Sequence, residues 1–152
     1  MRINIVAVGR LKEKYFADAV AEYAKRMGAY CDFRVIEVPA APPAKSANEQ
    51  KETEGAELLT KASGCVIALD GRGKKLSSPA LAELIKRRCS AGDSEFSFLI
   101  GGSHGLSDGV LARADETVSF GEMTFPHQLF RVMLAEQLYR AMTINAGTPY
   151  HK

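Results

Sequence analysis

Three glycine-containing segments follow apolar runs along the chain, and they are the first candidates for chemistry. They are Leu69–Gly73, Gly101–Gly105 and Gly121–Pro126. A residue without a Cβ lets a ligand approach the backbone closely, and α/β sheets bind ligands beyond the carboxyl ends of their strands. If the three preceding strands are neighbours, the three segments converge on one ligand.

The three segments lack both common phosphate-binding patterns. Gly101–Gly105 reads GGSHG, which is not GxGxxG, and no GxxxxGK[ST] occurs in the chain. No glycine loop on the first strand is followed by an acidic residue about 20 positions later, which disfavours a dinucleotide fold. The pattern favours a ligand held by backbone amides and carbonyls, such as an adenosyl group. It leaves open that the glycines only form tight turns.

A second group of candidates lies at the end of the chain. Arg140 could hold a phosphate or stabilise negative charge on a base, or it could simply pair with Glu136 one helical turn away. Tyr150 could stack on a base or hydrogen-bond to it. His151 could act as a base or contact phosphate, because imidazole changes charge near neutral pH. The alternative for both tail residues is a frayed terminus.

Three further polar residues have open roles. His104, between two glycines, could face an acceptor or lie on the surface. His127, in the first turn of the last helix, could be structural or catalytic. Arg131 could contact RNA or a second subunit.

Composition narrows the class of protein. A chain of 152 residues forms one domain (residues 1–152), with 46% hydrophobic and 25% charged residues. No run of 18 apolar residues occurs, so no membrane span is expected, and the N-terminal MRINIVAVGR reads as a buried strand rather than a signal peptide. Three scattered cysteines without a CxxC pair suggest a reduced, cytoplasmic protein without a metal site. The net charge of +2 means that any nucleic-acid role depends on local patches or shape.

Apolar runs alternate with helical patterns throughout, and most of the runs lack polar alternation. This predicts an α/β fold in which helices flank a mostly parallel sheet. Asp70–Lys75 is expected to be a flexible basic loop. Strands are expected at Ile3–Val8, Phe33–Val38, Cys65–Leu69, Ser97–Ile100 and Val118–Phe120, and helices at about 13–27, 46–61, 77–89, 107–112 and 127–143.

The last helix has an unusual distribution of apolar residues. It is expected to begin beside Pro126, with Thr124 as N-cap, and to end near Thr143. Its apolar residues cover more than one face, so a single core contact would not bury them all. Such a helix is either wholly internal or shared with a second subunit.

Taken together, several stretches resemble the RlmH family, which are SPOUT-class methyltransferases that act on large-subunit ribosomal RNA. The resemblance covers essentially the whole chain. It is carried by LIGGSHGLS (Leu99–Ser107), FPHQLFRVMLAEQLYRA (Phe125–Ala141), the ending PYHK, the opening INIVAVG and the segment VIALDGRGK.

The resemblance implies a fold and an activity that periodicity does not show. The C-terminal segment would be threaded into a trefoil knot, and the protein would be a homodimer. S-adenosylmethionine would donate a methyl group to N3 of a pseudouridine in 23S rRNA, on the assembled ribosome rather than on naked RNA.

The family's cofactor positions fall on the same three glycine-containing segments. The chain departs from the family pattern at Ser103, His104, Gly121 and Glu122, where a backbone role survives but side-chain roles stay open. The implied cofactor residues are Leu69, Gly101, Gly121, Glu122, Met123, Thr124, Phe125 and Pro126, and the catalytic candidates are Arg140, Tyr150 and His151.

Two other classes of function remain. A ribosome-binding assembly protein would bind rRNA without affinity for the cofactor. An enzyme that uses an adenine nucleotide would prefer ATP or a dinucleotide, although its phosphate loops are missing.

Overall fold

A computed structural model describes all 152 residues, and five parallel strands form its centre. Their order across the sheet is β2-β1-β4-β3-β5. Because all five strands run in the same direction, all their carboxyl ends lie at one edge. The elements are β1 (Arg2–Val8), α1 (Lys14–Met27), β2 (Asp32–Val38), α2 (Ala47–Lys61), β3 (Cys65–Lys75), α3 (Ser78–Ser90), β4 (Glu95–Ile100), α4 (Asp108–Arg113), β5 (Glu116–Ser119) and α5 (His127–Ala146).

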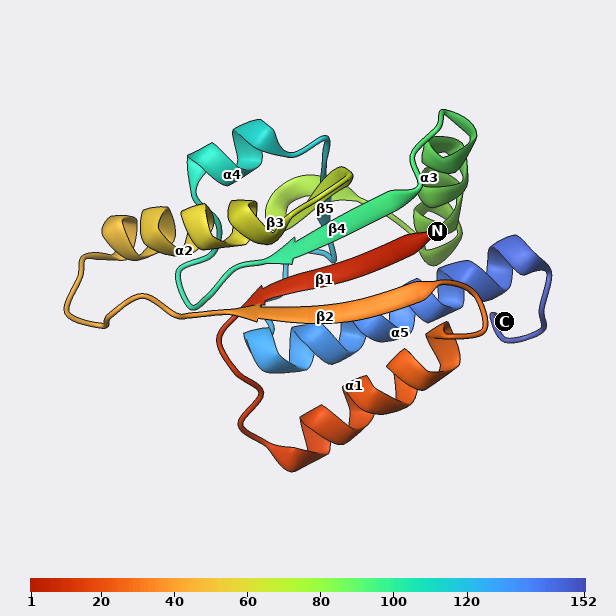
Figure 1. Cartoon of the computed structure of the whole chain (residues 1–152), viewed down its shortest axis with the longest axis horizontal. Helices are drawn as coiled ribbons and strands as arrows, with labels where there is room; N and C mark the ends of the chain where they lie inside the picture. The colour runs from red at the N-terminus through yellow and green to blue at the C-terminus, as the bar shows by residue number, and fades with distance from the viewer.

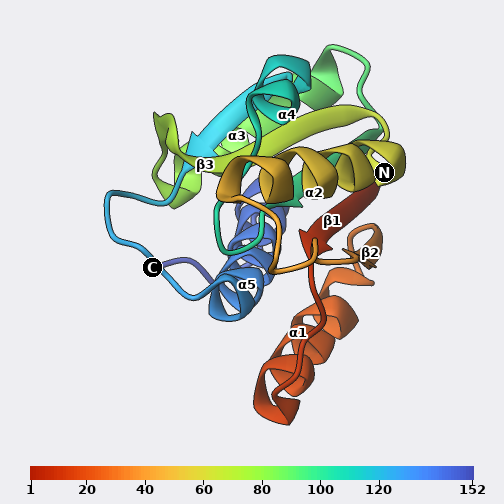
Figure 2. The same ribbon diagram turned by 90° about the vertical axis from the view of Figure 1, so that its left-hand side faces the viewer.

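Helices cover both faces of the sheet, as Figures 1 and 2 show. Helices α1, α3 and α5 share one apolar cluster with alternate residues of the strands, such as Ile3 and Ile5 of β1. Helices α2 and α4 share a smaller cluster with the opposite face, to which Val6 and Val8 belong. The strands are therefore buried on both faces, which explains their continuous apolar runs. The expected α/β fold with a parallel sheet is confirmed.

The second half of β3 differs from the expectation. Asp70–Lys75 was expected to be a flexible loop, but it belongs to the strand. After Leu69 the strand leaves its register with β5 and rejoins it at Lys74. A Cβ on Gly73 would lie 2.6 Å from the carbonyl carbon of Thr117, so the lack of a side chain lets the two backbones meet.

The last helix begins and ends differently from the expectation. Pro126 occupies the N-cap position, without a side-chain cap, and Thr124 is exposed and does not cap the helix. The helix continues past Thr143 to Ala146 and stops at Gly147, whose φ of +72° suits a residue without a Cβ. None of the helices is long and apolar enough to cross a membrane.

Arg131 of α5 is a structural residue inside the chain. Its side chain is 1% exposed, and its Nη1 atom lies 2.6 Å from Oε2 of Glu37, at the end of β2. Nη2 donates to the carbonyl oxygen of Gly9 at 3.0 Å, and Glu37 also accepts from the backbone amide of Leu11. Arg131 therefore fastens the first turns of α5 to the ends of β1 and β2. The expected contact with RNA or a second subunit does not fit so buried a group.

Replacing Glu37 with Gln tests this link. The change leaves the buried guanidinium without its carboxylate, so we expect the free energy of unfolding to fall by about 1–3 kcal/mol. Asp18→Asn is the matched control, because Asp18 pairs with Lys14 on an exposed helix face and should lose at most about 0.5 kcal/mol. Urea unfolding at one protein concentration measures both values. Equal stability of the two variants would contradict a structural role for the Glu37–Arg131 pair.

Candidate functional site

The three glycine-containing segments meet in one cavity of about 200 Å³ at the carboxyl edge of the sheet. The cavity lies beyond β3, β4 and β5, which are adjacent in the sheet. Its walls combine glycine backbone with aromatic and aliphatic side chains, a combination that suits an apolar, planar ligand. The lining residues are Leu69, Asp70, Gly71, Ile100, Gly101, Gly102, Gly105, Val118, Ser119, Phe120, Gly121, Met123, Phe125, His127 and Phe130.

The segment after β4 folds tightly back on itself. Gly102 and Gly105 form an antiparallel bridge, and the amide of Gly105 donates to the carbonyl of Gly102 at 3.0 Å. A Cβ on Gly101 would lie 2.6 Å from the backbone carbon of Gly105. Gly105 itself has a φ of +83°. Glycine at these positions keeps the backbone compact enough to form one wall of the cavity.

Asp70 lies at the point where β3 leaves its register, and an arginine holds its side chain. Arg72 donates from Nε at 2.8 Å and from Nη2 at 3.0 Å, a two-point contact. This hydrogen-bonded pair lowers the pKa of Asp70 below its ordinary value. Arg72 also reaches the carbonyl oxygen of Leu106 at 3.4 Å. The pair therefore connects the first segment to the residue that directly follows the second.

The third wall is the loop between β5 and α5. Ser119 and Gly121 form a tight turn, in which the Ser119 hydroxyl accepts from the Gly121 amide at 3.1 Å. Gly121 has a φ of +117°, a region that few other residues adopt. The rings of Phe120 and Phe130 lie 4.7 Å apart and brace the loop against α5. Met123 is 79% exposed, an unusual position for a large apolar side chain at the rim of a cavity.

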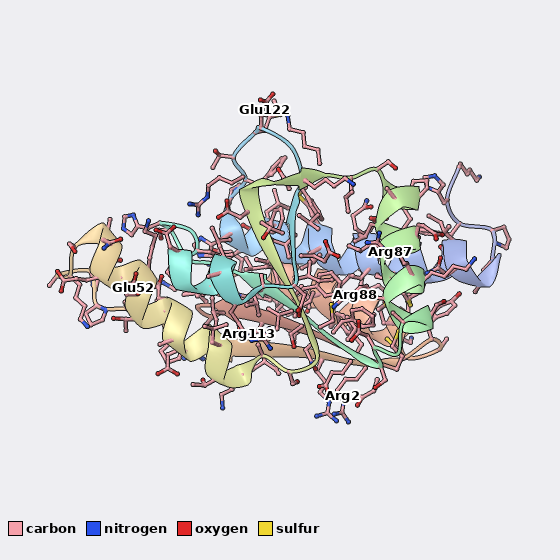
Figure 3. All side chains as sticks on the ribbon, turned by 90° about the horizontal axis from the view of Figure 1, so that it is seen from above. Arg2, Glu52, Arg87, Arg88, Arg113 and Glu122 are labelled. Carbon is pink, nitrogen blue, oxygen red and sulfur yellow. The ribbon has the colours of Figure 1, made fainter.

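The expected cofactor residues divide into two sets. Glu122, Thr124 and Pro126 are exposed and do not line the cavity; Figure 3 shows Glu122 at the outer end of its loop. Phe120 and Phe130 were missed, although an aromatic residue at a strand end and another one turn into the next helix are a readable signal. Of the expected cofactor residues, five line the cavity: Leu69, Gly101, Gly121, Met123 and Phe125.

The catalytic candidates form a second cluster near the C-terminus. Glu136 accepts from Nε of Arg140 at 2.9 Å and from the Tyr150 hydroxyl at 3.3 Å. The Arg140 guanidinium lies 4.8 Å from the centre of the Tyr150 ring, and its Nη1 atom is 3.2 Å from Nδ1 of His151. The structure thus brings Arg140, Tyr150 and His151 together and also forms the Glu136–Arg140 pair.

All three groups in this cluster present hydrogen-bond donors. Burial, followed by the negative charge of Glu136, raises the pKa of the Tyr150 phenol, which therefore keeps its proton at neutral pH. A guanidinium only donates, so in this contact Nδ1 of His151 is the acceptor. In the single chain the guanidinium and the phenol donate to Glu136, so negative charge on a ligand would compete with this carboxylate for them.

Within one chain the cavity and the donor cluster are far apart. His127 lines the cavity at the start of α5, and Arg140 follows 13 positions later on the same helix. That separation is about 20 Å along the helix axis. After Gly147 the tail turns back beside the helix, where Tyr150 contacts Glu136 and His151 contacts Arg140. One chain therefore holds Arg140 well away from the cavity.

Several arginines that could contact RNA are paired with acidic residues. On α3, Arg87 lies 3.5 Å from Glu116 and Arg88 lies 2.9 Å from Asp93; Figure 3 labels both arginines. Arg72 is held by Asp70. No group of three or more His, Cys, Asp or Glu side chains is arranged to hold a metal ion.

Comparison with known proteins identifies the family. Residues 1–151 match the family model described as Predicted SPOUT methyltransferase. The chain therefore belongs to the SPOUT methyltransferase family. Within it, the chain groups with the proteins named ribosomal RNA large subunit methyltransferase H. It is 50% identical to the one from Limosilactobacillus reuteri and 48% identical to the one from Clostridium acetobutylicum, each over the full length of both chains.

Solved structures show the same fold at lower identity. A protein from Haemophilus influenzae described as a probable methylase family protein has a TM-score of 0.54 and 14% identity, over 99% of this chain and 70% of its own. TrmJ from Z. mobilis has a TM-score of 0.52 and 17% identity, over 100% of this chain and 73% of its own. These likenesses support the fold alone.

Replacing Gly101 with Ala tests the cavity. The added Cβ would collide with the backbone of Gly105, so the wall must move, and we expect affinity for S-adenosylmethionine to fall at least about tenfold. Gly71→Ala is the control, because Gly71 lines the same cavity but has no atom within 4 Å of an added Cβ. Calorimetric titration measures both. Unchanged affinity in Gly101→Ala would show that the cofactor binds elsewhere.

Proposed function

We propose that this protein methylates N3 of a pseudouridine in 23S rRNA, acting on the assembled ribosome. Family membership supports the general part of this function. The chain is a large-subunit ribosomal RNA methyltransferase, and S-adenosylmethionine is its methyl donor. The pseudouridine, its N3 atom and the assembled ribosome come from the resemblance to the RlmH family. The observation that carries the proposal is the convergence of three glycine-containing segments on one cavity.

The cavity fits the adenosyl part of the donor. Leu69, Ile100 and Phe120 offer apolar surface to a planar purine, and the glycine segments expose backbone amides and carbonyls to its polar edges. The donor brings a methyl group already activated on a sulfonium. The protein therefore has to orient donor and acceptor and exclude water, and positioning alone is a strong catalytic effect.

The acceptor nitrogen carries a proton that must leave before or during attack. Loss of that proton places negative charge on the base, and donors aimed at developing charge lower the barrier. Arg140, Tyr150 and His151 supply such donors through a guanidinium, a phenol and an imidazole N–H. We assign them to stabilising the anionic base. The proton then leaves to bulk solvent as the anion forms, before the donor and acceptor are closed off from water.

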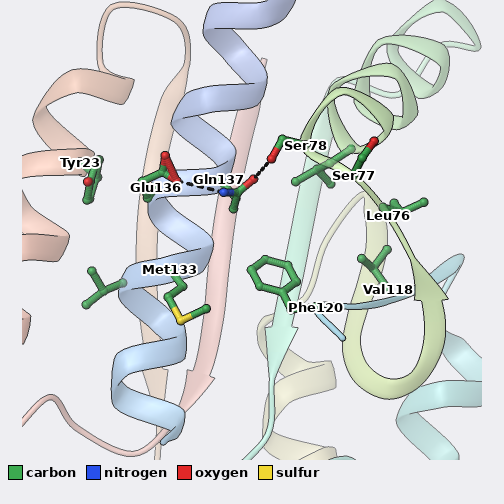
Figure 4. Close-up of a pocket in the computed structure, with 11 residues that line it drawn as sticks. Tyr23, Leu76, Ser77, Ser78, Val118, Phe120, Met133, Glu136 and Gln137 are labelled. Atoms are coloured by element: carbon green, nitrogen blue, oxygen red, sulfur yellow. Dashed lines mark hydrogen bonds between the residues drawn. The ribbon is translucent and has the colours of Figure 1, made fainter. Parts of the chain in front are cut away.

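We further propose that the protein acts as a homodimer formed through α5. The largest cavity, about 510 Å³, runs beside this helix and is mainly apolar (Figure 4). Val132, Met133 and Phe120 line it together with Tyr23 of α1, and none of these side chains is fully buried. Part of the apolar surface of α5 is thus left for a second copy to cover.

A dimer would also join the two separated parts of the site. In a two-fold interface, the same patch of each copy meets the other, so antiparallel α5 helices place the end of one beside the start of its partner. In this arrangement the separation of about 20 Å between His127 and Arg140 along one helix brings Arg140 of each copy beside the cavity of the other. One subunit would supply the cofactor cavity, and the other would supply Arg140, Tyr150 and His151.

The ribosome as substrate agrees with the weak overall charge. A net charge of +2 gives little general attraction to RNA, so recognition would depend on the shape of an assembled particle. We also propose that the protein is cytoplasmic, since a ribosomal substrate is found there.

Methyl transfer from labelled S-adenosylmethionine tests the proposal. We expect label in the 23S rRNA of 70S ribosomes prepared from cells that lack this protein, little label on separate subunits or free rRNA, and one labelled pseudouridine after nuclease digestion. Label on free rRNA alone would contradict the proposal that the protein recognises the shape of the assembled ribosome. No transfer and no cofactor binding would favour an assembly protein instead.

Mixed dimers test the shared site. We expect Gly101→Ala and Arg140→Ala homodimers each to lose about 100-fold or more in methyl transfer. After subunit exchange in equal amounts, activity should return to about a quarter of wild type, because half of the dimers are mixed and each has one intact site. Arg113→Ala, on the opposite face of the sheet, serves as the active control. No recovery after verified exchange would mean that each site belongs to one chain.

A further inference from the structure

One arginine, in the connection between β1 and α1, differs from all the others. Nine of the ten arginines lie within ion-pair distance of an Asp or Glu side chain, and Arg10 is the one that does not. Lys12 is exposed and has no acidic partner either, whereas Lys14 pairs with Asp18 at 2.7 Å. Glu13 is the only carboxylate in the connection. Two neighbouring cations without partners create a local positive potential that attracts anions.

The backbone that carries these two cations is fixed at the cofactor edge of the sheet. The amide of Leu11 donates to Glu37 at 3.0 Å. The amide of Lys12 donates to Oε1 of Gln128 at 3.2 Å, and Gln128 follows His127, which lines the cofactor cavity. Figure 1 shows the connection from β1 to α1 running past the start of α5. The two cations are therefore held beside the place where the acceptor has to enter.

The first turn of α1 adds an aromatic ring to this surface. Tyr15 is 64% exposed, and it is the only exposed aromatic side chain in the protein. Its ring meets the ring of Phe16 edge-on, with 4.6 Å between the two centres, so the tyrosine is braced rather than free to turn. Sites for single-stranded nucleic acid combine the same two features, because bases stack on aromatic rings while cations follow the phosphates.

RNA is the partner that suits all three side chains. The target base has to reach the methyl group of the donor, so the nucleotides linked to it must cross this edge of the sheet. Every nucleotide brings a phosphate, and unpaired bases can leave their stack and lie on a tyrosine. An acidic protein surface could also meet the two cations, but it would give Tyr15 no base to stack on.

We propose that Arg10, Lys12 and Tyr15 form an RNA-binding surface beside the acceptor site. Arg10 and Lys12 contact phosphates of nucleotides that flank the target, and Tyr15 stacks on an unpaired base among them. The inference rests on the proposed function in taking ribosomal RNA as the substrate. It adds the local surface with which a chain of net charge +2 holds that RNA.

Removing the two charges tests the phosphate contacts. Co-sedimentation with 70S ribosomes at several KCl concentrations and constant Mg²⁺ measures affinity, and methyl transfer gives kcat and KM. For Arg10→Gln/Lys12→Gln we expect affinity to fall about 10- to 100-fold and the slope of log affinity against log salt to become shallower by about 1.4–1.8. The KM for ribosomes should rise, while kcat and cofactor affinity stay unchanged. Lys61→Gln/Lys86→Gln removes the same charge near the opposite edge of the sheet and should behave like wild type.

Substitutions of Tyr15 test the stacking contact. Tyr15→Leu keeps an apolar side chain but cannot stack, so we expect ribosome affinity to fall about 5- to 50-fold with an unchanged salt slope. Tyr15→Phe keeps the ring and should bind within about twofold of wild type. A benzophenone amino acid at position 15 should cross-link to 23S rRNA in purified 70S ribosomes, and ribonuclease should digest the linked product.

Four results would overturn the inference. If Arg10→Gln/Lys12→Gln matches its control in affinity and salt slope, the cations do not contact phosphate. If Tyr15→Leu binds as tightly as Tyr15→Phe, the ring does not stack. Cross-links to a ribosomal protein would make an acidic protein the partner. Loss of the dimer in Tyr15→Leu, seen by sedimentation velocity, would assign the surface to the contact between subunits.

Failure of the proposed function is distinguishable from failure of this inference. The first appears in wild-type protein, as binding to ribosomes without methyl transfer, and the second appears only in the variants and the cross-links. Binding and cross-linking need no methyl transfer, so they decide the inference in either case. Wild-type protein that does not bind ribosomes would reject both.

Discussion

The common direction of the five strands is the constraint on which the rest of the molecule depends. It places the ends of β3, β4 and β5 side by side, so three segments far apart in the sequence form one cavity. Glycine is then required where backbones meet, at Gly73 against β5 and at Gly101 within its own segment. Side chains then stabilise the cavity walls. The rings of Phe120 and Phe130 hold the β5–α5 loop against α5, and the Asp70–Arg72 pair holds the segment after Leu69.

The length of helix α5 then determines how far Arg140 lies from the cavity within one chain. Arg131 fastens its first turns to the sheet, with Gly9 and Glu37 as partners, so the start of the helix is fixed beside the cavity. Its far end carries Arg140 and the tail residues about 20 Å away. A rigid helix cannot fold back to close that distance. The same rigidity is what would let two copies, paired in opposite directions, build two equal sites.

Sequence reasoning predicted the architecture well, because strands buried on both faces leave continuous apolar runs. It also located the three segments of the cavity, because glycines after such runs are visible in one sequence. It missed the second half of β3, since Lys74 and Lys75 pair with β5 through backbone contacts that side-chain character does not reveal. The burial of Arg131 and of Glu54 could not be predicted either, because both depend on which segments pack against them.

Photo-cross-linking from position 150 tests the shared site most directly. A benzophenone amino acid would replace Tyr150 in a mixture of isotopically light and heavy protein, and mass spectrometry would then identify the linked peptides. The account predicts links between light and heavy chains that join position 150 to the segment Gly121–His127. Links confined to one chain, to α5 near Glu136 and Tyr139, would contradict it.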